Sequence, residues 1–338
     1  MPRSTTQTPT GAGLLAGVGL ACALYAVLLV AAPRVASAAE EDEPVAQPVL
    51  KSWEVRALTG LQYDSNVALD PTGQRVPDSV ADPADGAITL GAGLSYHVLD
   101  QDWVNLTLDY DLYQTLHFRL VEYDLRSNRI QATAGVELLP QLWLGAQGGF
   151  EQYALGGDGF SREPFVAPFV SYTQGDWGLT QLLYRHGYTT YLQGVFEDIR
   201  NGPTDVATLS QTFYWRRSYA TVGYEFGSER PVSAAGDDYR FRYNQGYVGV
   251  GFTPGWRSAI DVTYVYRHEN YTEPNSLASP PFSADRQDDI NQLQVALRRS
   301  IGRWFSVGLT YYGTFDDSNI DFYTYDRHIV SAEVRFAY

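Results

Sequence analysis

The 338-residue sequence predicts an all-β fold, a 14-stranded antiparallel up-and-down transmembrane β-barrel. Three observations predict it. Apolar and polar residues alternate with a period of two along most of the chain. The connections between these alternating runs are short and long by turns, and the final run ends on an aromatic residue, Tyr338. Helical periodicity does not appear convincingly anywhere.

The first residues resemble a secretory leader. A basic start at Arg3 precedes an apolar run over 11–32 and the small-residue sequence ASA at 36–38. This pattern predicts a signal peptide over 1–38. The apolar run also approaches membrane-spanning length, so an uncleaved signal anchor is the alternative. We expect the rest to comprise a short periplasmic segment, 39–51, and an outer-membrane barrel, 52–338.

Composition excludes several classes of protein. Cys22 is the only cysteine and lies inside the leader, so the mature chain has no disulfide or thiol chemistry. The formal net charge is −15, and loss of the leader with Arg3 and Arg34 makes the remainder more acidic. A polyanion is unsuited to binding nucleic acid.

The alternation is strict in the clearest runs. Over 88–98, "ITLGAGLSYHV" places isoleucine, leucine, alanine, tyrosine and valine on one face and small or polar residues on the other. Such alternation indicates strands with one apolar face. The predicted strands are 52–69, 87–99, 103–117, 126–139, 142–154, 164–173, 177–191, 204–215, 219–229, 240–253, 258–269, 288–299, 303–315 and 325–338.

The connections indicate how the strands are arranged. Few residues follow the even-numbered runs, as in "DQD" and "TPGW", whereas longer segments such as "GGDGFSREP" and "GSERPVSAAGDD" follow the odd-numbered ones. Short periplasmic turns, long outer loops and an even strand number are typical of outer-membrane barrels of Gram-negative bacteria. Both termini are then periplasmic.

Charged residues indicate which face is wet. One face of nearly every run carries Glu, Asp, Arg or Gln, and in a dry core each such charge would cost several kcal/mol. We therefore expect this face to line a watery lumen. A water-soluble sandwich or lipocalin-like barrel, with its apolar face inside, is the alternative. The residues predicted to line the lumen or its mouth are Arg56, Asp64, Asn66, Asp109, Asp111, Arg129, Glu225, Asp261, Arg267, Glu333 and Arg335.

The first run ends in a polar cluster. We expect Tyr63 and Val67 to face lipid, and Asp64 and Asn66 to face the lumen. The polar cluster marks the point where the strand leaves the bilayer. The alternative is that Asp64 and Asn66 bind a cation or anchor an inward-folded loop at the mouth.

Two short segments resemble known families. "GLQYDSNVAL" at 60–69 resembles the "YDSNV" segment that opens the barrel of surface lipoprotein assembly modifiers and of similar barrels linked to tetratricopeptide repeats. That resemblance implies a surface-assembly role, although this chain lacks a helical repeat domain. The final strand, "IVSAEVRFAY", is similar to the signal that barrel-insertion machinery recognises.

Catalytic and metal-binding motifs are sparse. Ser95 and His97 share a face, but no serine motif or third orienting acid accompanies them. The histidines show no metal-ligand spacing, and no phosphate-binding loop is found. We expect neither an enzyme nor a cofactor or metal.

The charge distribution suggests transport. The outer segments are acidic and would concentrate cations, or would simply stay soluble and bind divalent ions among lipopolysaccharide phosphates. We expect a passive, weakly cation-preferring channel for small solutes. The alternative is a surface assembly, export or adhesion barrel that engages a lipoprotein or polysaccharide. Expected partners are outer-membrane lipid, lipopolysaccharide and the insertion machinery that recognises Tyr338.

Overall fold

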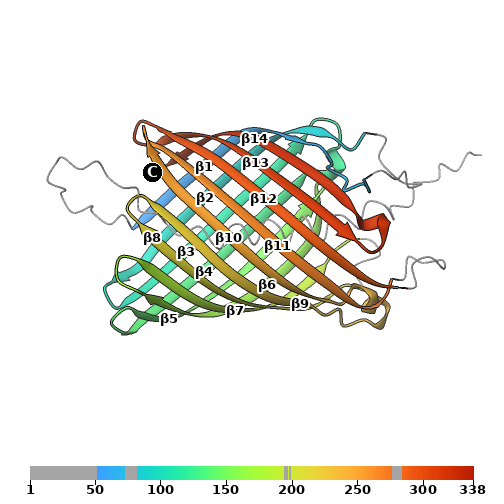
Figure 1. Cartoon of the computed structure of the whole chain (residues 1–338), viewed down its shortest axis with the longest axis horizontal. Helices are drawn as coiled ribbons and strands as arrows, with labels where there is room; N and C mark the ends of the chain where they lie inside the picture. The colour runs from blue at the N-terminus through green and yellow to red at the C-terminus, as the bar shows by residue number, and fades with distance from the viewer. Residues whose placement is uncertain (1–51, 73–81, 194–196, 198, 276–283) are drawn as a thin grey trace, which may run out of the picture.

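The computed structural model describes residues 52–72, 82–193, 197, 199–275 and 284–338. They form one closed barrel in which each strand pairs with its sequence neighbours and β1 pairs with β14 (Figure 1). The strands are β1 (Trp53–Asp64), β2 (Asp85–Gln101), β3 (Val104–His117), β4 (Leu125–Leu139), β5 (Leu142–Leu155), β6 (Asp158–Thr173), β7 (Gly178–Tyr191), β8 (Gly202–Trp215), β9 (Ser218–Glu229), β10 (Phe241–Gly255), β11 (Ser258–Pro274), β12 (Asp285–Ile301), β13 (Phe305–Ser318) and β14 (Tyr325–Ala337).

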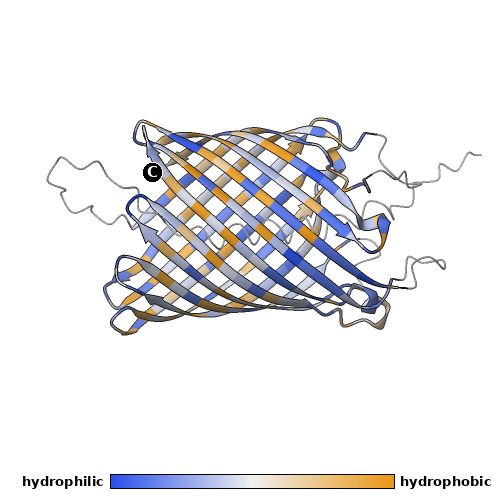
Figure 2. Ribbon diagram, viewed as in Figure 1, coloured by the Kyte–Doolittle hydropathy of each residue, from blue (hydrophilic) through white to orange (hydrophobic). Residues whose placement is uncertain are grey.

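The predicted fold class is confirmed, including the two runs at 177–191 and 204–215 whose alternation is blurred. The apolar face of the wall points outward: Leu90 is 40% exposed and Val222 is 47% exposed. Hydrophobic and hydrophilic residues alternate along the strands that face the viewer in Figure 2. The barrel therefore has an apolar outer surface and a polar inner wall, the reverse of a soluble barrel.

Tight turns follow the even-numbered strands and form one end of the barrel, here called the turn end. Trp256 and Arg257 both have positive φ, 53° and 57°, between β10 and β11. Two such residues match the twist of paired strands in a two-residue hairpin. The C-terminus lies at this end (Figure 1), and the Tyr338 ring packs against Trp53 and Trp304, with centroids 5.0 and 4.5 Å away.

The opposite end, here called the loop end, carries three short 3₁₀ helices among the described residues: Val121–Tyr123, Ala234–Tyr239 and Asp321–Tyr323. One predicted long loop is wrong. β5 and β6 are joined by Gly156 and Gly157 alone, because both glycines adopt positive φ, 58° and 94°, and make a two-residue turn. The segment "GGDGFSREP" is therefore mostly strand.

Two prolines interrupt the pairing of β6 with one of its two neighbours. Pro164 and Pro168 pair with Phe150 and Ala146 on β5, yet neither is paired in the ladder to β7. A proline donates no backbone hydrogen bond, so it interrupts the ladder on one side of a strand without ending the strand.

The prediction that Val67 faces lipid is wrong. β1 ends at Asp64, and Val67 lies in the following turn, where it is buried with Ala68, Tyr123 and Leu120. The first and second connections of the loop end thus pack together. Burial, and then the nearby Asp70 and Glu122 carboxylates, raise the pKa of the Tyr123 hydroxyl to about 12.

The predicted leader, 1–38, and the segment 39–51 lie outside the described residues, as does Cys22. In the part of the chain that is described, no helix has the length and apolarity needed to cross a membrane.

Candidate functional site

The inner wall of the barrel is the candidate site, because it gathers charged side chains from nearly every strand. Its acidic residues are Glu54, Asp64, Asp85, Asp109, Asp111, Glu137, Glu151, Glu163, Glu225, Glu229, Asp261, Glu269, Asp288, Asp316 and Glu333. Its arginines are Arg56, Arg129, Arg185, Arg267, Arg286, Arg298, Arg327 and Arg335. Carboxylates therefore outnumber guanidinium groups on this wall.

The half nearer the turn end carries partly exposed ion pairs. Arg56 on β1 reaches past β2 to Asp111 on β3, with a nitrogen–oxygen distance of 3.0 Å, and lies 3.9 Å from Glu54. Asp109, one inward position from Asp111, accepts a 2.6 Å hydrogen bond from the Ser95 hydroxyl. Side chains exposed to this degree remain hydrated, so their charges act on the water and ions in the bore.

A hollow of about 640 Å³ opens at the turn end. Its lining combines charged and polar side chains with the aromatic rings of the barrel rim. The lining residues are Trp53, Glu54, His97, Asp100, Asn105, Thr107, Thr133, Arg303, Trp304, Ala337 and Tyr338. The hollow therefore lies at the turn end of the barrel, beside the seam between β1 and β14.

Asp261 on β11 and the end of β14, the strand next to β1, make further pairs. Asp261 accepts hydrogen bonds from Arg298 (2.8 Å) and from the Tyr219 hydroxyl (2.9 Å). Arg335 pairs with Glu333 two residues earlier on β14, at 2.6 Å. Both clusters balance opposite charges along the wall, as the alternating pattern of the strands allows.

Towards the loop end the charged residues form a denser network. Arg185 lies between Glu151 (3.1 Å) and Glu163 (3.0 Å), and its guanidinium stacks 4.0 Å above the centre of the Phe165 ring. Arg129 approaches Glu151 from the other side, at 3.4 Å. An arginine held by two carboxylates and an aromatic face is fixed in place, since each contact restrains the planar group.

A second network lies on β9 to β11. Arg267 pairs with Glu269 at 2.6 Å and stacks 3.7 Å above the Tyr243 ring. The Tyr243 hydroxyl in turn donates a 2.7 Å hydrogen bond to Glu225. The predicted residues Glu225 and Arg267 both contact the same tyrosine.

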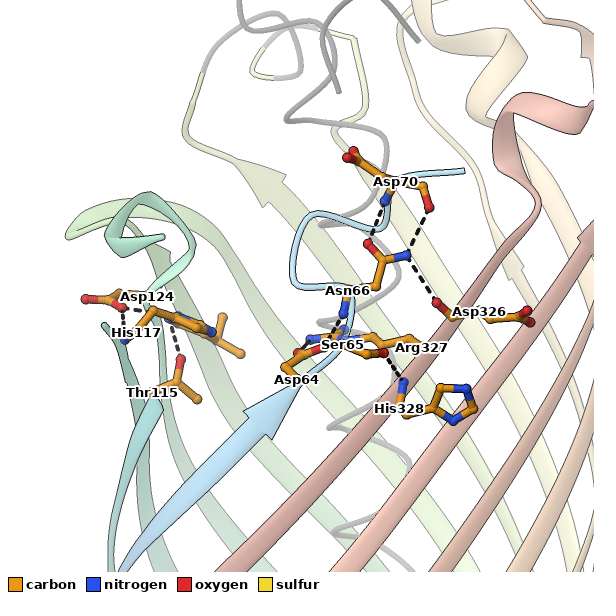
Figure 3. A network of polar contacts seen from close by, with 11 residues as sticks. Asp64, Ser65, Asn66, Asp70, Thr115, His117, Asp124, Asp326, Arg327 and His328 are labelled. Carbon is orange, nitrogen blue, oxygen red and sulfur yellow. Dashed lines mark hydrogen bonds and ion pairs between the residues drawn. The ribbon is translucent and has the colours of Figure 1, made fainter. Parts of the chain in front are cut away.

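Asp64 and Asn66 lie at the loop end of the seam between β1 and β14 (Figure 3). Asp64 accepts hydrogen bonds of 3.0 and 3.1 Å from Arg327. The Asn66 amide donates to the backbone carbonyls of Asp70 (2.9 Å) and Asp326 (3.1 Å). Both residues therefore fasten the first connection to the last strand.

Cross-strand pairs of an aromatic residue and a glycine shape the bore. Tyr247 lies opposite Gly223, Tyr243 opposite Gly227, and Tyr219 opposite Gly251. A methyl group on Gly223 would lie 2.2 Å from the Tyr247 ring, so the ring lies over the glycine. Two phenylalanines make the same pairing on β6, Phe165 with Gly149 and Phe169 with Gly145. The aromatic rings therefore cover the glycines on the inner wall.

Ser95 and His97 do not join into one constellation. Ser95 donates to Asp109, whereas the His97 ring is 3.1 Å from the Thr107 hydroxyl. Within the described ranges, no three His, Cys, Asp or Glu side chains are grouped so that they could hold a metal ion.

Several charged residues of the wall were not among the predicted lumen residues, namely Glu163, Arg185, Glu269, Arg286 and Asp288. Glu163 and Arg286 lie outside the predicted runs 164–173 and 288–299, because β6 begins at Asp158 and β12 at Asp285. A repeated tripeptide would have located the two stacked arginines: YRH occurs at 184–186 and 266–268. Its arginine points inward in both copies.

The tyrosine and histidine of each YRH copy face outward and share one aspartate on the next strand. In 184–186 they contact Asp205, with distances of 2.5 and 2.8 Å. In 266–268 they contact Asp289, with distances of 2.6 and 2.8 Å. The same local design therefore supports the wall at β7–β8 and at β11–β12.

Comparison with known proteins identifies similar folds but does not assign the chain to a family. No family model matches the sequence, and no curated protein matches it. The outer membrane channel DcaP of Acinetobacter baumannii is similar in structure, with a TM-score of 0.52 and 7% identity over 85% of this chain and 97% of that chain. An anion-selective porin from Comamonas acidovorans has a TM-score of 0.50 and 8% identity over 85% and 98% of the two chains. The chain therefore has the fold of outer-membrane barrels, while the resemblance of 60–69 to assembly modifiers stays a prediction.

Proposed function

We propose that the protein is an outer-membrane channel through which small solutes diffuse passively, with a weak preference for cations. The apolar outer surface fits hydrocarbon, and the charged inner wall fits water. A 14-stranded ring is wider than the eight-stranded barrels that side chains fill. Similarity in fold to an outer-membrane channel is consistent with this role.

The excess of carboxylates on the inner wall is the observation that carries the cation preference. Fixed charges that line a narrow aqueous path concentrate ions of the opposite sign and repel those of the same sign. A similar barrel is an anion-selective porin, so the preference for cations proposed here comes from the side chains of the wall and not from the fold. Here the partly exposed pairs at the turn end, led by Asp109, Asp111 and Arg56, are the main determinants.

The proposal includes the way the chain reaches the membrane. Residues 1–38 direct export and are removed, 39–51 lie in the periplasm, and the turn end faces that compartment. The aromatic end of β14, closed by Tyr338, is the segment that the insertion machinery recognises. The outward tyrosines and histidines at the loop end lie at the height where lipopolysaccharide meets the barrel.

Single-channel recording tests this function. The purified, refolded protein in a planar bilayer between unequal KCl solutions should give steady conductance and a reversal potential of the sign set by potassium. Absence of conductance in correctly folded protein would contradict the channel and favour the assembly or export barrel. A reversal potential set by chloride would contradict the cation preference alone.

A further inference from the structure

Three carboxylates meet two arginines on the inner wall of β11 to β13, towards the loop end. Glu269 on β11 is paired with Arg267 at 2.6 Å, and Asp288 on β12 is paired with Arg286 at 2.6 Å. Asp316 on β13 interacts electrostatically with all four of these residues. Two positive charges thus face three carboxylates, and Asp316 is the one without an arginine of its own among the described residues.

Asp316 is almost completely removed from solvent. It is 2% exposed, and neither carboxylate oxygen has a hydrogen-bond partner in the described part of the chain. Burial of an ionised carboxylate is strongly unfavourable unless another charge or hydrogen-bond donors compensate it. The folded barrel therefore needs either a proton or a cation at Asp316.

Two hydroxyl groups beside Asp316 are also buried and without a hydrogen-bond partner among the described residues. Tyr325 on β14 is the direct cross-strand partner of Asp316, and Thr314 lies two residues earlier on the same face of β13. Both side chains are more than nine-tenths buried, and their oxygens have no hydrogen-bond partner among the described residues. Each hydroxyl oxygen has lone pairs that it can offer to a cation. The two hydroxyl groups are therefore evidence for a cation site that is independent of the charge of Asp316.

We propose that Asp316, Thr314 and Tyr325 form a binding site for one small monovalent cation, either an alkali ion or a primary ammonium group. The donor set consists only of oxygen atoms and carries one uncompensated negative charge, which suits a hard monovalent ion better than a transition metal. With the ion bound, the charges of this part of the wall balance. The site rests on the proposed channel function and deepens it, because a cation held here favours cation passage.

A stability measurement tests the site without requiring conduction. Refolded barrel in detergent is heated in NaCl, KCl or methylammonium chloride, and in N-methyl-D-glucamine chloride of the same ionic strength as the bulky reference. A ligand that binds only the folded state raises its melting temperature. We expect a higher melting temperature in at least one small cation, and comparison of the alkali salts with methylammonium identifies the preferred class.

Variants on the same strand make this test specific. Asp316→Asn should abolish the dependence on the small cation, and Tyr325→Phe should weaken it. Asp317→Asn removes the same charge from the next residue, which is exposed and faces outward, and should respond as the wild type does. The proposal is overturned if the wild type shows no small-cation effect, or if Asp316→Asn retains it.

Reversal potentials separate this proposal from the channel proposal. In a planar bilayer, Asp316→Asn should lower the ratio of cation to anion permeability, whereas Asp317→Asn should not. If the barrel does not conduct but its melting temperature still depends on the small cation, the channel proposal is contradicted and the cation-site proposal stands. If the barrel conducts, and Asp316→Asn changes neither the cation dependence of the melting temperature nor the reversal potential, the cation-site proposal is contradicted and the channel proposal stands.

Discussion

Asp64 on β1 and Arg327 on β14 form a two-pronged ion pair across the seam where the barrel closes (Figure 3). The backbone of Ser65 continues the seam by donating a 3.0 Å hydrogen bond to His328. At the other end of the seam, the rings of Trp53 and Tyr338 are in contact. The first and last strands are therefore held together at both ends, by charge at one and by aromatic packing at the other.

Replacement of Asp64 tests the seam. Asp64→Asn leaves the Arg327 guanidinium, which is largely buried, with a neutral partner. We expect the free energy of unfolding in detergent to fall by about 1–3 kcal/mol, the usual effect of losing a charged hydrogen-bond partner. Asp326→Asn is the matched control, because Asp326 joins the network through its backbone. Equal stability of the two variants in urea titrations would contradict this role.

Glycines opposite aromatic rings should resist substitution. In Gly223→Ala the new methyl group would overlap the Tyr247 ring, which must then move off the wall. We expect a loss of about 1–3 kcal/mol in stability from overpacking and a smaller single-channel conductance, because the displaced ring enters the bore. Gly246→Ala, whose methyl group would meet nothing within 4 Å, should change neither quantity. Unchanged conductance in Gly223→Ala would show that the ring does not border the path.

The packing of the first two loop-end connections should depend on alkaline pH. The Tyr123 hydroxyl has a pKa of about 12 in the folded protein, against about 10 in an unfolded chain. Because its pKa is raised on folding, the Tyr123 hydroxyl loses its proton at lower pH in the unfolded state than in the folded one. Its contribution to the free energy of unfolding is therefore complete below pH 10 and declines as the pH rises towards 12. The wild type should therefore lose more stability than Tyr123→Phe between pH 9 and 12, measured by denaturant titration. An identical decline in both proteins would rule out the contribution.

Charge changes at the turn end should shift selectivity in opposite directions. Arg56→Gln removes a positive charge and should raise the ratio of cation to anion permeability, whereas Asp111→Asn should lower it. The two residues are ion-paired and partly exposed, so both shifts should shrink as salt screens them. Reversal potentials at 0.1 M and 1 M KCl measure this. Shifts of the same sign in the two variants would contradict electrostatic control at this position.

The number of strands, and the face of a strand on which a residue lies, could be predicted from the sequence. Alternation with a period of two is a local pattern that does not depend on distant contacts. Parity along each strand is enough to assign Arg56, Asp111 and Arg267 to the polar face of their strands. Partners could not be predicted in the same way, since they depend on register and on which side chains meet across two strands. Arg56 pairs with Asp111 past an intervening strand, and Glu225 and Arg267 contact the same ring, that of Tyr243.

Two predictions were wrong because the backbone conformation differed from the one that the residue types had indicated. Gly156 and Gly157 were interpreted as the start of a loop, but their positive φ angles make a tight hairpin. Val67 follows the outward parity of β1, yet the chain has already left the sheet and turns the side chain towards Tyr123. In both cases the residue types were compatible with two conformations, and only tertiary packing selected one.

Adjacent single cysteines test most directly whether the bore is wet and the outer surface faces lipid. Thr107 lines the hollow at the turn end and Leu108, the next residue, is exposed on the outside; in each variant Cys22 is replaced by serine. In proteoliposomes, a charged, water-soluble thiol reagent should label Thr107→Cys and spare Leu108→Cys, whereas brominated lipids should quench a fluorophore attached only in Leu108→Cys. The reverse pattern, or quenching at both positions, would contradict the account.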